Sequence, residues 1–306
     1  LAFPFSISDI KKNYMKNNPN FDVVIIGGSY AGLSAAMALG RSLRNVLIID
    51  NNDACNKQTP HSHNFITQDG KTPGEIALEA KKQVLNYPTI QFLEDTVIDI
   101  QKNESFTITC ENTIIKADYI VLATGVKDIM PNIKGFDRCW GISVIHCPYC
   151  HGYEVKNEKT GILGNGDLAF HYAKLLTNLT KELVIFTNGK ANFTTEQFEK
   201  LNQYNIEIVE KEVVEIKHQN GQLNAILFKD QSNYNINVIY ASFGVTQKTN
   251  FAENLGCEIT DKGLIKVYEN FANDFLYPNI DNILVFLENH DTHRFNHIYP
   301  NFKDYQ

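Results

Sequence analysis

A strand, a glycine-rich turn, a helix and a second strand follow one another twice along this chain, and this repeat limits the fold more than any other feature. The first copy runs from DVVII at 22–26 through GGSYAGLSAAMALGRSLRN to VLIID at 46–50. The second copy is TGILGNGDLAFHYAKLLTNLTKELVIFTNG at 160–189. Short apolar runs followed by small and apolar residues at helical spacing are typical of βαβ units. We therefore predict an α/β chain with two Rossmann-like dinucleotide-binding domains.

The first glycine turn has the spacing of GxGxxG, with Gly27, Ser29 and Gly32 at the marked positions. Such a turn brings the backbone close to a pyrophosphate at the helix N-terminus, and Asp50 is placed to bond a ribose hydroxyl. Tight packing alone also produces glycine turns, so nucleotide binding and plain packing both stay open for this turn taken alone. The residues expected to hold a nucleotide here are Gly27, Gly28, Ser29, Ala31, Gly32, Asp50 and Asn51.

Two later segments complete the first domain. The apolar run YIVLATG at 119–125 predicts a strand ending in a small-residue turn, in which Ala123, Thr124 and Gly125 are candidate cofactor contacts. Before it, VIDIQKNESFTITCENTIIKAD at 97–118 alternates apolar and polar residues around turn-forming residues. This alternation predicts an antiparallel meander.

The motif HCPYCHGYE at 146–154 carries reactive chemistry. A CxxC spacing holds two sulfurs within disulfide reach and commonly makes a thiolate available for exchange. Among the six cysteines, only Cys147 and Cys150 are closely paired, which is unlike a secreted disulfide framework. The alternatives are two ordinary buried cysteines or a zinc site completed by Cys139, His146 and His151. Because those histidines flank the pair directly, we favour a redox dithiol and expect no metal. CPYC also resembles the glutaredoxin site, but here it lies in the middle of the chain.

Charge and hydropathy exclude several partners. The formal net charge is -7 and no run of Lys and Arg is present, which argues against nucleic acid and anionic membrane surfaces. No apolar stretch approaches the roughly 20 residues that span a bilayer, and Pro4 and Asp9 interrupt the place of a signal peptide. We expect a cytoplasmic protein in which residues 1–14, before Met15, are a disordered arm or translated upstream sequence.

The second copy has Gly164, Gly166 and Ala169 in GxGxxA positions, and the CxxC lies directly before it. Two such units with a dithiol between them resemble the low-molecular-weight thioredoxin reductases, which are FAD- and NAD(P)-dependent pyridine nucleotide-disulfide oxidoreductases. The resemblance covers about residues 21–285 and rests on GGSYAG, HSHNFITQDG at 61–70, the ATG strand, HCPYCHGYE and LGNGDLA. Relatives with CPYC also include fungal dithiol oxidases that act on small metabolites.

The resemblance implies an organisation for the chain. Both domains would be of the three-layer ββα type, with the NAD(P)-binding domain at 128–245 inserted into an FAD-binding domain formed by 15–127 and 246–306. The insert carries the CxxC, and its NGQLNAILF segment suits a hairpin turning at Asn220 and Gly221. The family also implies a homodimer. The residues expected to bind the nicotinamide nucleotide are Gly164, Asn165, Gly166 and Asp167.

The resemblance also implies roles. Hydride would pass from NAD(P)H to FAD, then electrons to the disulfide, and the dithiol would reduce a thioredoxin-like protein or a small disulfide. Cys150 would face the flavin and Cys147 would attack the substrate. His151 stands where the family commonly has an Asp general acid, and an imidazole can pass protons near neutrality. His61, His63 and Asn64 are expected near the isoalloxazine, although a pair of loop histidines is about as often solvated or hydrogen-bonded to the backbone.

Two departures from the family pattern keep other functions open. Phe186, Thr187 and Asn188 stand where NADPH-dependent members have an arginine pair for the 2'-phosphate, which favours NADH or leaves the donor undecided. Leu287 and Glu288 stand in place of a Gly-Asp pair whose acid holds the flavin ribityl chain, and the remaining tail is too short for the family's last helix. The alternatives are therefore a nicotinamide-independent dithiol oxidase and a degenerate, noncatalytic nucleotide-binding or redox-sensing protein.

Overall fold

The computed structural model describes residues 20–261, 263–266 and 283–284, which form two compact units. The first unit contains the described residues of 1–53, 77–125 and 247–306. The second contains 54–76 and 126–246. Residues 54–76, expected within the first FAD-binding segment, therefore group with the unit that carries the CxxC.

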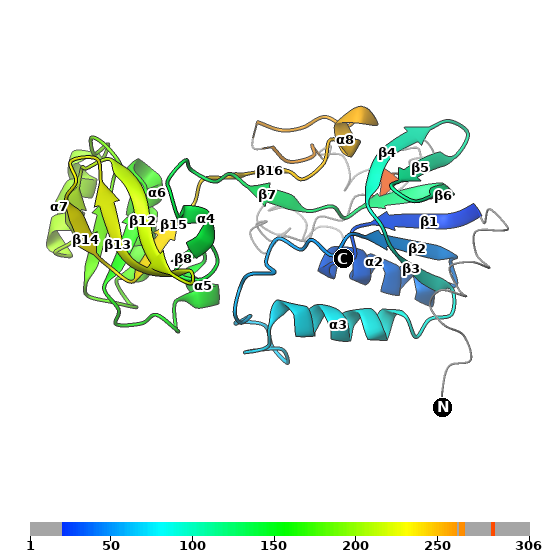
Figure 1. Ribbon diagram of the computed structural model, residues 1–306, viewed down its shortest axis with the longest axis horizontal. Helices are drawn as coiled ribbons and strands as arrows, with labels where there is room; N and C mark the ends of the chain where they lie inside the picture. The colour runs from blue at the N-terminus through cyan, green and yellow to red at the C-terminus, as the bar shows by residue number, and fades with distance from the viewer. Residues whose placement is uncertain (1–19, 262, 267–282, 285–306) are drawn as a thin grey trace, which may run out of the picture. The chain divides into compact units, whose positions relative to one another are not determined.

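The first unit is a mixed sheet with a helical layer (Figure 1). The predicted first βαβ unit is confirmed as β1 (Asn20–Ile26), α2 (Tyr30–Arg41) and β2 (Val46–Asp50), with β1 and β2 parallel. The sheet order is β3 (Ile90–Glu94), β2, β1, β6 (Ile114–Leu122), β5 (Phe106–Cys110) and β4 (Val97–Lys102), and β17 (Ile283–Leu284) pairs with β6 in parallel.

The long strand β6 takes part in two kinds of pairing. Its first half runs antiparallel to β5, with Phe106 opposite Ala117, and this confirms the predicted meander. Its second half runs parallel to β1, with Val23 opposite Tyr119. The strand therefore ends beside the glycine turn, and the Ala123 N–H donates to the Ile26 carbonyl at 2.8 Å.

The central strands of the first unit are buried on both faces, which explains their unbroken apolar runs. In β1, Val24 packs into the core on one side of the sheet, whereas Ile25 packs with α2 on the other. The second core also includes Val84 of α3 (Pro73–Val84), so α2 and α3 cover the same face. Successive side chains of a strand point to opposite faces, so neither face tolerates a polar residue here.

The second unit has three layers. Its parallel sheet has the order β11 (Glu207–Val209), β10 (Leu183–Phe186), β9 (Thr160–Leu163), β15 (Val238–Ala241) and β8 (Val144–Ile145). One core packs Leu163 and Phe186 against the antiparallel sheet of β12 (Val213–Gln219), β13 (Gln222–Phe228) and β14 (Asn233–Asn235). The other core packs the opposite face against α6 (Gly166–Leu176) and α7 (Thr195–Gln203). The ββα layering and the second βαβ unit are thus as predicted.

The predicted hairpin of the second unit is also confirmed. Asn220 and Gly221 join β12 to β13 with φ of 53° and 82°, the left-handed values that a two-residue hairpin turn requires. A Cβ on Gly221 would lie 2.5 Å from Ile142, so glycine is needed there for space as well.

Short elements link and flank the two units. The chain passes between them in β7 (Val126–Asp128) and returns in β16 (Val245–Gln247), and these two strands pair with each other. The remaining short helices are α4 (Phe136–Cys139), α5 (Pro148–His151) and α8 (Phe251–Asn254).

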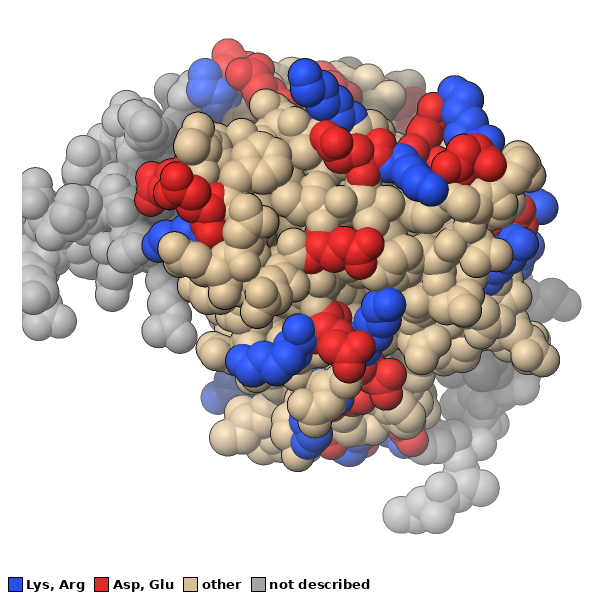
Figure 2. Space-filling view, turned by 90° about the vertical axis from the view of Figure 1, so that its left-hand side faces the viewer, with Lys and Arg blue, Asp and Glu red and all other residues tan. Residues whose placement is uncertain are grey.

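The surface charge and the length and polarity of the helices can both be described. Figure 2 shows acidic and basic side chains interspersed over a mostly uncharged face of the second unit. Within the described part of the chain, every helix is too short or too polar to cross a lipid bilayer.

The tightest backbone approach in the first unit yields a stability prediction. A Cβ on Gly32 would lie 1.8 Å from the Gly27 carbonyl oxygen, so Gly32→Ala should lower the free energy of unfolding by about 1–3 kcal/mol. Gly74→Ala is the matched control, because a Cβ there meets no atom within 4 Å. Urea unfolding followed by far-UV circular dichroism measures both, and equal midpoints for the two variants would contradict the packing argument.

Candidate functional site

The dithiol lies at the carboxyl edge of the parallel sheet in the second unit. Strand β8 ends at Ile145, and Cys147 follows two residues later as the N-cap of α5. Strand β9 lies two places along the same sheet and leads into the second glycine turn. Because parallel strands end at a common edge, the CxxC and this turn emerge from the same side of the sheet.

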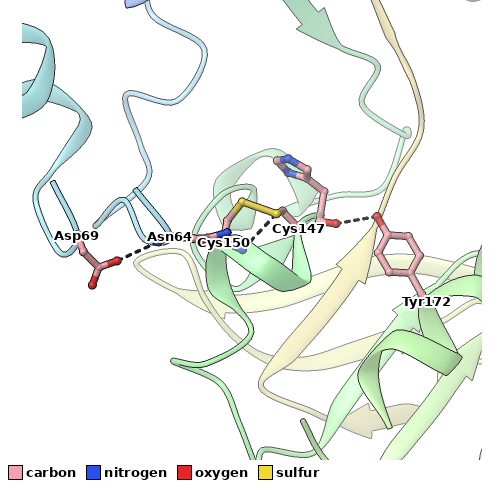
Figure 3. The surroundings of a disulfide bond; sticks show 6 residues. Asn64, Asp69, Cys147, Cys150 and Tyr172 are labelled. Carbon is pink, nitrogen blue, oxygen red and sulfur yellow. Dashed lines mark hydrogen bonds between the residues drawn. A yellow bond between two sulfur atoms is a disulfide. The ribbon is translucent and has the colours of Figure 1, made fainter. Parts of the chain in front are cut away.

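Cys147 and Cys150 form a disulfide across the start of α5 (Figure 3). The backbone N–H of Cys150 donates to Sγ of Cys147 at 3.2 Å. Pro148 occupies the first turn, where its fixed φ suits a helix start. The preceding residue is also anchored, because the Tyr172 hydroxyl donates to the His146 carbonyl at 2.7 Å. An N–H directed at Sγ of Cys147 stabilises negative charge on that sulfur once the pair is reduced.

Three other thiols are unsuited to exchange. Burial raises the pKa of Cys110 to about 12, and it also raises the pKa of Cys139 and of Cys257. Cys139 is fully buried beside Phe136 in the core under the sheet, which removes it from the zinc set considered from the sequence. Among the described residues, no cluster of three or more His, Cys, Asp and Glu side chains is arranged to hold a metal ion.

The segment 61–70 closes into a compact loop in the same unit as the dithiol. The Ser62 N–H donates to the Lys71 carbonyl at 2.7 Å, and the Gly70 N–H donates to the Ser62 carbonyl at 2.8 Å. At the tip, Asn64 has a φ of 59° and its N–H donates to Oδ1 of Asp69 at 2.9 Å. Figure 3 shows Asn64 and Asp69 on the Cys150 side of the disulfide and Tyr172 on the other. The structure thus brings His63 and Asn64 together with the CxxC.

Histidines and carboxylates surround this part of the second unit. The two ring nitrogens of His63 each face a carboxylate at 3.5 Å, Nδ1 toward Asp69 and Nε2 toward Glu154. Burial lowers the pKa of His151, and electrostatic interaction with His146 and His63 lowers it further. The Glu154 carboxylate acts in the opposite direction and raises it. At neutral pH the His151 imidazole is therefore unprotonated and can accept a proton from a thiol.

The first glycine turn fits a dinucleotide pyrophosphate. Ser29 is the N-cap of α2 but makes no side-chain hydrogen bond to the first turn, which carries no acidic residue. The helix start thus keeps its positive end open to an anion. Gly27 adopts φ of 108°, and a Cβ there would lie 2.1 Å from the Ala123 carbonyl oxygen. This contact joins the turn to the Ala123, Thr124 and Gly125 segment.

An acid stands beside the same turn at the end of β2. One Asp50 carboxylate oxygen accepts the Gly28 N–H at 2.5 Å and the other accepts the Asn52 N–H at 2.8 Å. These bonds orient the carboxylate, whose remaining lone pairs can accept ribose hydroxyls. Among the described residues of this unit, those expected to hold FAD, Asn51 and Ala31 included, are thus gathered at one edge of one sheet.

The second glycine turn has a different chemistry. Oδ1 of Asn165 accepts the N–H groups of Gly166 and Asn192, at 2.9 and 2.8 Å, and its Nδ2 donates to the Lys190 carbonyl at 2.9 Å. Asp167 stands in the first turn of α6, where Gln197 holds its carboxylate at 2.7 Å. The Asn165 side chain thus already occupies backbone N–H donors at the helix start, and Asp167 adds a negative charge where a pyrophosphate would bind. Gly164 still leaves open space, because a Cβ there would meet only Ala169 at 3.8 Å.

Leu287 and Glu288 lie outside the described residues, so the proposed flavin contact of Glu288 stays a prediction. Asp69 and Glu154 were not expected to take part, although both lie inside the motifs HSHNFITQDG and HCPYCHGYE. The occurrence of an acidic residue within each of these two histidine-containing motifs is the sequence signal that points to Asp69 and Glu154.

Comparisons with known proteins agree with this geometry. Residues 21–283 match the family described as pyridine nucleotide-disulphide oxidoreductase. The chain is similar to the thioredoxin reductase tcpT of Claviceps purpurea, with 30% identity over 82% of each chain. It is also similar to the solved structure of a putative thioredoxin reductase from Bacillus anthracis, with a TM-score of 0.79 and 30% identity over 87% of this chain and 88% of that one. An oxidoreductase from Agrobacterium tumefaciens gives a TM-score of 0.77 and 32% identity over 87% and 89%.

The surroundings of His151 predict how it titrates. In histidine-selective NMR the His151 imidazole, identified by its loss in His151→Gln, should titrate with a pKa below the ordinary value of about 6.5. Because the unfolded chain binds this proton more readily, His151 contributes stability that is present above about pH 6.5 and is lost as the pH falls through the folded-state pKa. The unfolding free energy of wild type should therefore fall more steeply with acid than that of His151→Gln. Equal slopes would contradict the assignment.

Proposed function

The chain belongs to the pyridine nucleotide-disulphide oxidoreductases, and on that premise we propose an FAD-dependent disulfide oxidoreductase whose Cys147–Cys150 pair passes electrons between NAD(P)H-reduced flavin and a substrate disulfide. The chain is a thioredoxin-reductase-like oxidoreductase. The observation that carries this proposal is a disulfide at the carboxyl edge of a Rossmann sheet, followed directly in the sequence by His151, whose pKa is lowered by burial. The substrate class is a thioredoxin-like protein or a small-molecule disulfide.

FAD, when bound, would supply a two-electron redox centre, and the turn between β1 and α2 together with Asp50 would hold its pyrophosphate and ribose. Asp50 is already oriented by Gly28 and Asn52, so binding requires little rearrangement of that carboxylate. In the proposal, Cys150 exchanges electrons with the cofactor and Cys147 meets the substrate.

The chain's own residues then carry the thiol exchange. His151 takes the proton of the reduced Cys147 thiol, and the thiolate attacks one sulfur of the substrate disulfide. A mixed disulfide forms as the substrate S–S bond breaks, and the leaving sulfur takes the proton from His151. The Cys150 thiol next gives its proton to His151 and its sulfur attacks Sγ of Cys147, which re-forms the intramolecular disulfide; the second substrate sulfur leaves and takes that proton to become a thiol. The N–H of Cys150 supports this order, because it stabilises charge on Cys147.

A second candidate function has its own supporting observation. The capped and acidic start of α6 weakens pyrophosphate binding, which favours a nicotinamide-independent dithiol oxidase that runs the exchange in reverse. The electrons would then leave through the flavin to oxygen. A degenerate, noncatalytic nucleotide-binding or redox-sensing protein is the third candidate, and it is motivated by Leu287 and Glu288. The homodimer and the cytoplasmic location also stay predictions.

A trapping experiment should distinguish the roles of the Cys147 and Cys150 thiols. Cys150→Ser lacks the resolving thiol, so it should hold a disulfide substrate as a stable mixed disulfide and lose turnover by at least about 100-fold. Cys147→Ser should lose turnover without trapping. Cys55→Ser, which changes an exposed thiol outside the pair, should keep wild-type turnover. Intact-protein mass spectrometry reads the adduct, and trapping by Cys147→Ser instead would reverse the assignment.

Anaerobic stopped-flow absorbance of the flavin distinguishes the electron donors. Mixing with NADH or NADPH should reduce the flavin within a turnover time if the leading proposal holds. The oxidase predicts no reduction by either nucleotide, reduction by a dithiol, and reoxidation when oxygen is admitted. Asp167→Asn removes the charge at the start of α6 and should tighten nucleotide binding by about 2- to 5-fold. A flavin that neither nucleotide nor dithiol reduces would support the noncatalytic reading.

A further inference from the structure

Two carboxylates bracket a histidine on the loop that faces the redox helix. The His63 side chain is 24% exposed, and its two nitrogens lie 3.5 Å from Asp69 and 3.5 Å from Glu154. These separations are longer than those of short hydrogen bonds, and the contacts are ion pairs when the imidazole is protonated. A protonated imidazole has an N–H on each nitrogen, so it can satisfy both acids at once.

The two acids belong to different segments. Asp69 lies in the His63 loop and also accepts the Asn64 N–H, so it holds the loop tip together. Glu154 lies three residues beyond the end of α5, in the segment that carries the dithiol. The contact between His63 and Glu154 therefore joins the 61–70 loop to the CxxC segment.

Glu154 faces further titratable groups. Its negative charge raises the pKa of His151 against the effects of burial, His146 and His63. It also contributes to the raised pKa of the buried Tyr240, after burial itself. On the loop side, His63 faces Asp69 and has the His61 ring at 6.3 Å. Glu154 is thus the shared acid between one histidine of the loop and one histidine of the redox helix.

We propose that Glu154 is a positioning residue of the dithiol reaction, whose carboxylate holds His63 and the 61–70 loop against the segment carrying Cys147, Cys150 and His151. This inference rests on the proposed function, since the reaction that it serves is the thiol exchange. Loss of the carboxylate releases the loop from the CxxC segment and leaves His151 without its opposing negative charge.

The test compares Glu154→Gln with Glu158→Gln. Both remove one negative charge from the same segment, and among the described residues the Glu158 side chain has no ion pair with either histidine. In protein reduced beforehand, single-turnover exchange with a small aromatic disulfide should slow about 10-fold in Glu154→Gln and stay within about 2-fold in Glu158→Gln. The His151 signal should titrate at lower pH in Glu154→Gln only. Glu154→Asp, which keeps the charge, should recover part of the rate.

A double-mutant cycle shows whether Glu154 acts through His63. The rate losses of Glu154→Gln and His63→Gln should be non-additive, with the double variant close to the slower single variant. Additive losses, or a His151 titration unmoved in Glu154→Gln, would overturn the proposal. Failure of the proposed function is distinguishable, because it appears as unchanged exchange in Cys147→Ser, while the NMR titration of Glu154→Gln needs neither turnover nor flavin.

Discussion

Parallel pairing of β8, β15 and β9 decides where chemistry can take place in the second unit. The three strands end at one edge, so the dithiol after β8 and the glycine turn after β9 emerge from the same edge of the sheet, with β15 between their strands. Such a sheet must be covered on both faces, and the ββα layering provides this with one core toward β12–β14 and another toward α6 and α7. The reactive cysteines are thus presented from a rigid, fully covered scaffold.

The two glycine turns have the same strand-turn-helix backbone but differ in the charge and hydrogen bonding at the helix N-terminus. The start of α2 has no acid and an N-cap serine that makes no side-chain cap bond, so its positive end is free for an anion. At α6, Asn165 has already accepted two N–H groups and Asp167 adds a negative charge. A common fold therefore does not imply equal affinity for a dinucleotide, and this contrast bears directly on which electron donor the chain uses.

Electrostatics around the disulfide depend on groups that are distant in the sequence. Asp69 and His63 come from residues 61–70, whereas Glu154 and His151 come from 151–154. Partial burial lowers the pKa of His151 and so favours its neutral form, while Asp69 and Glu154 each lie 3.5 Å from a ring nitrogen of His63. The arrangement gathers imidazoles and carboxylates within one small region, which suits a reaction that moves protons to and from thiolates.

The sequence by itself determined the two βαβ units, the meander, the hairpin at Asn220 and Gly221, and the reactive pair, because each depends on local periodicity, turn chemistry or close spacing. Only the tertiary structure decided that residues 54–76 join the dithiol unit, that Cys139 is a core residue, and that Glu154 faces His63. The closure of the second turn by Asn165 also needed the fold, since its partner Asn192 lies 27 residues away. Long-range contacts of this kind follow from how layers pack, and no local pattern in the chain encodes them.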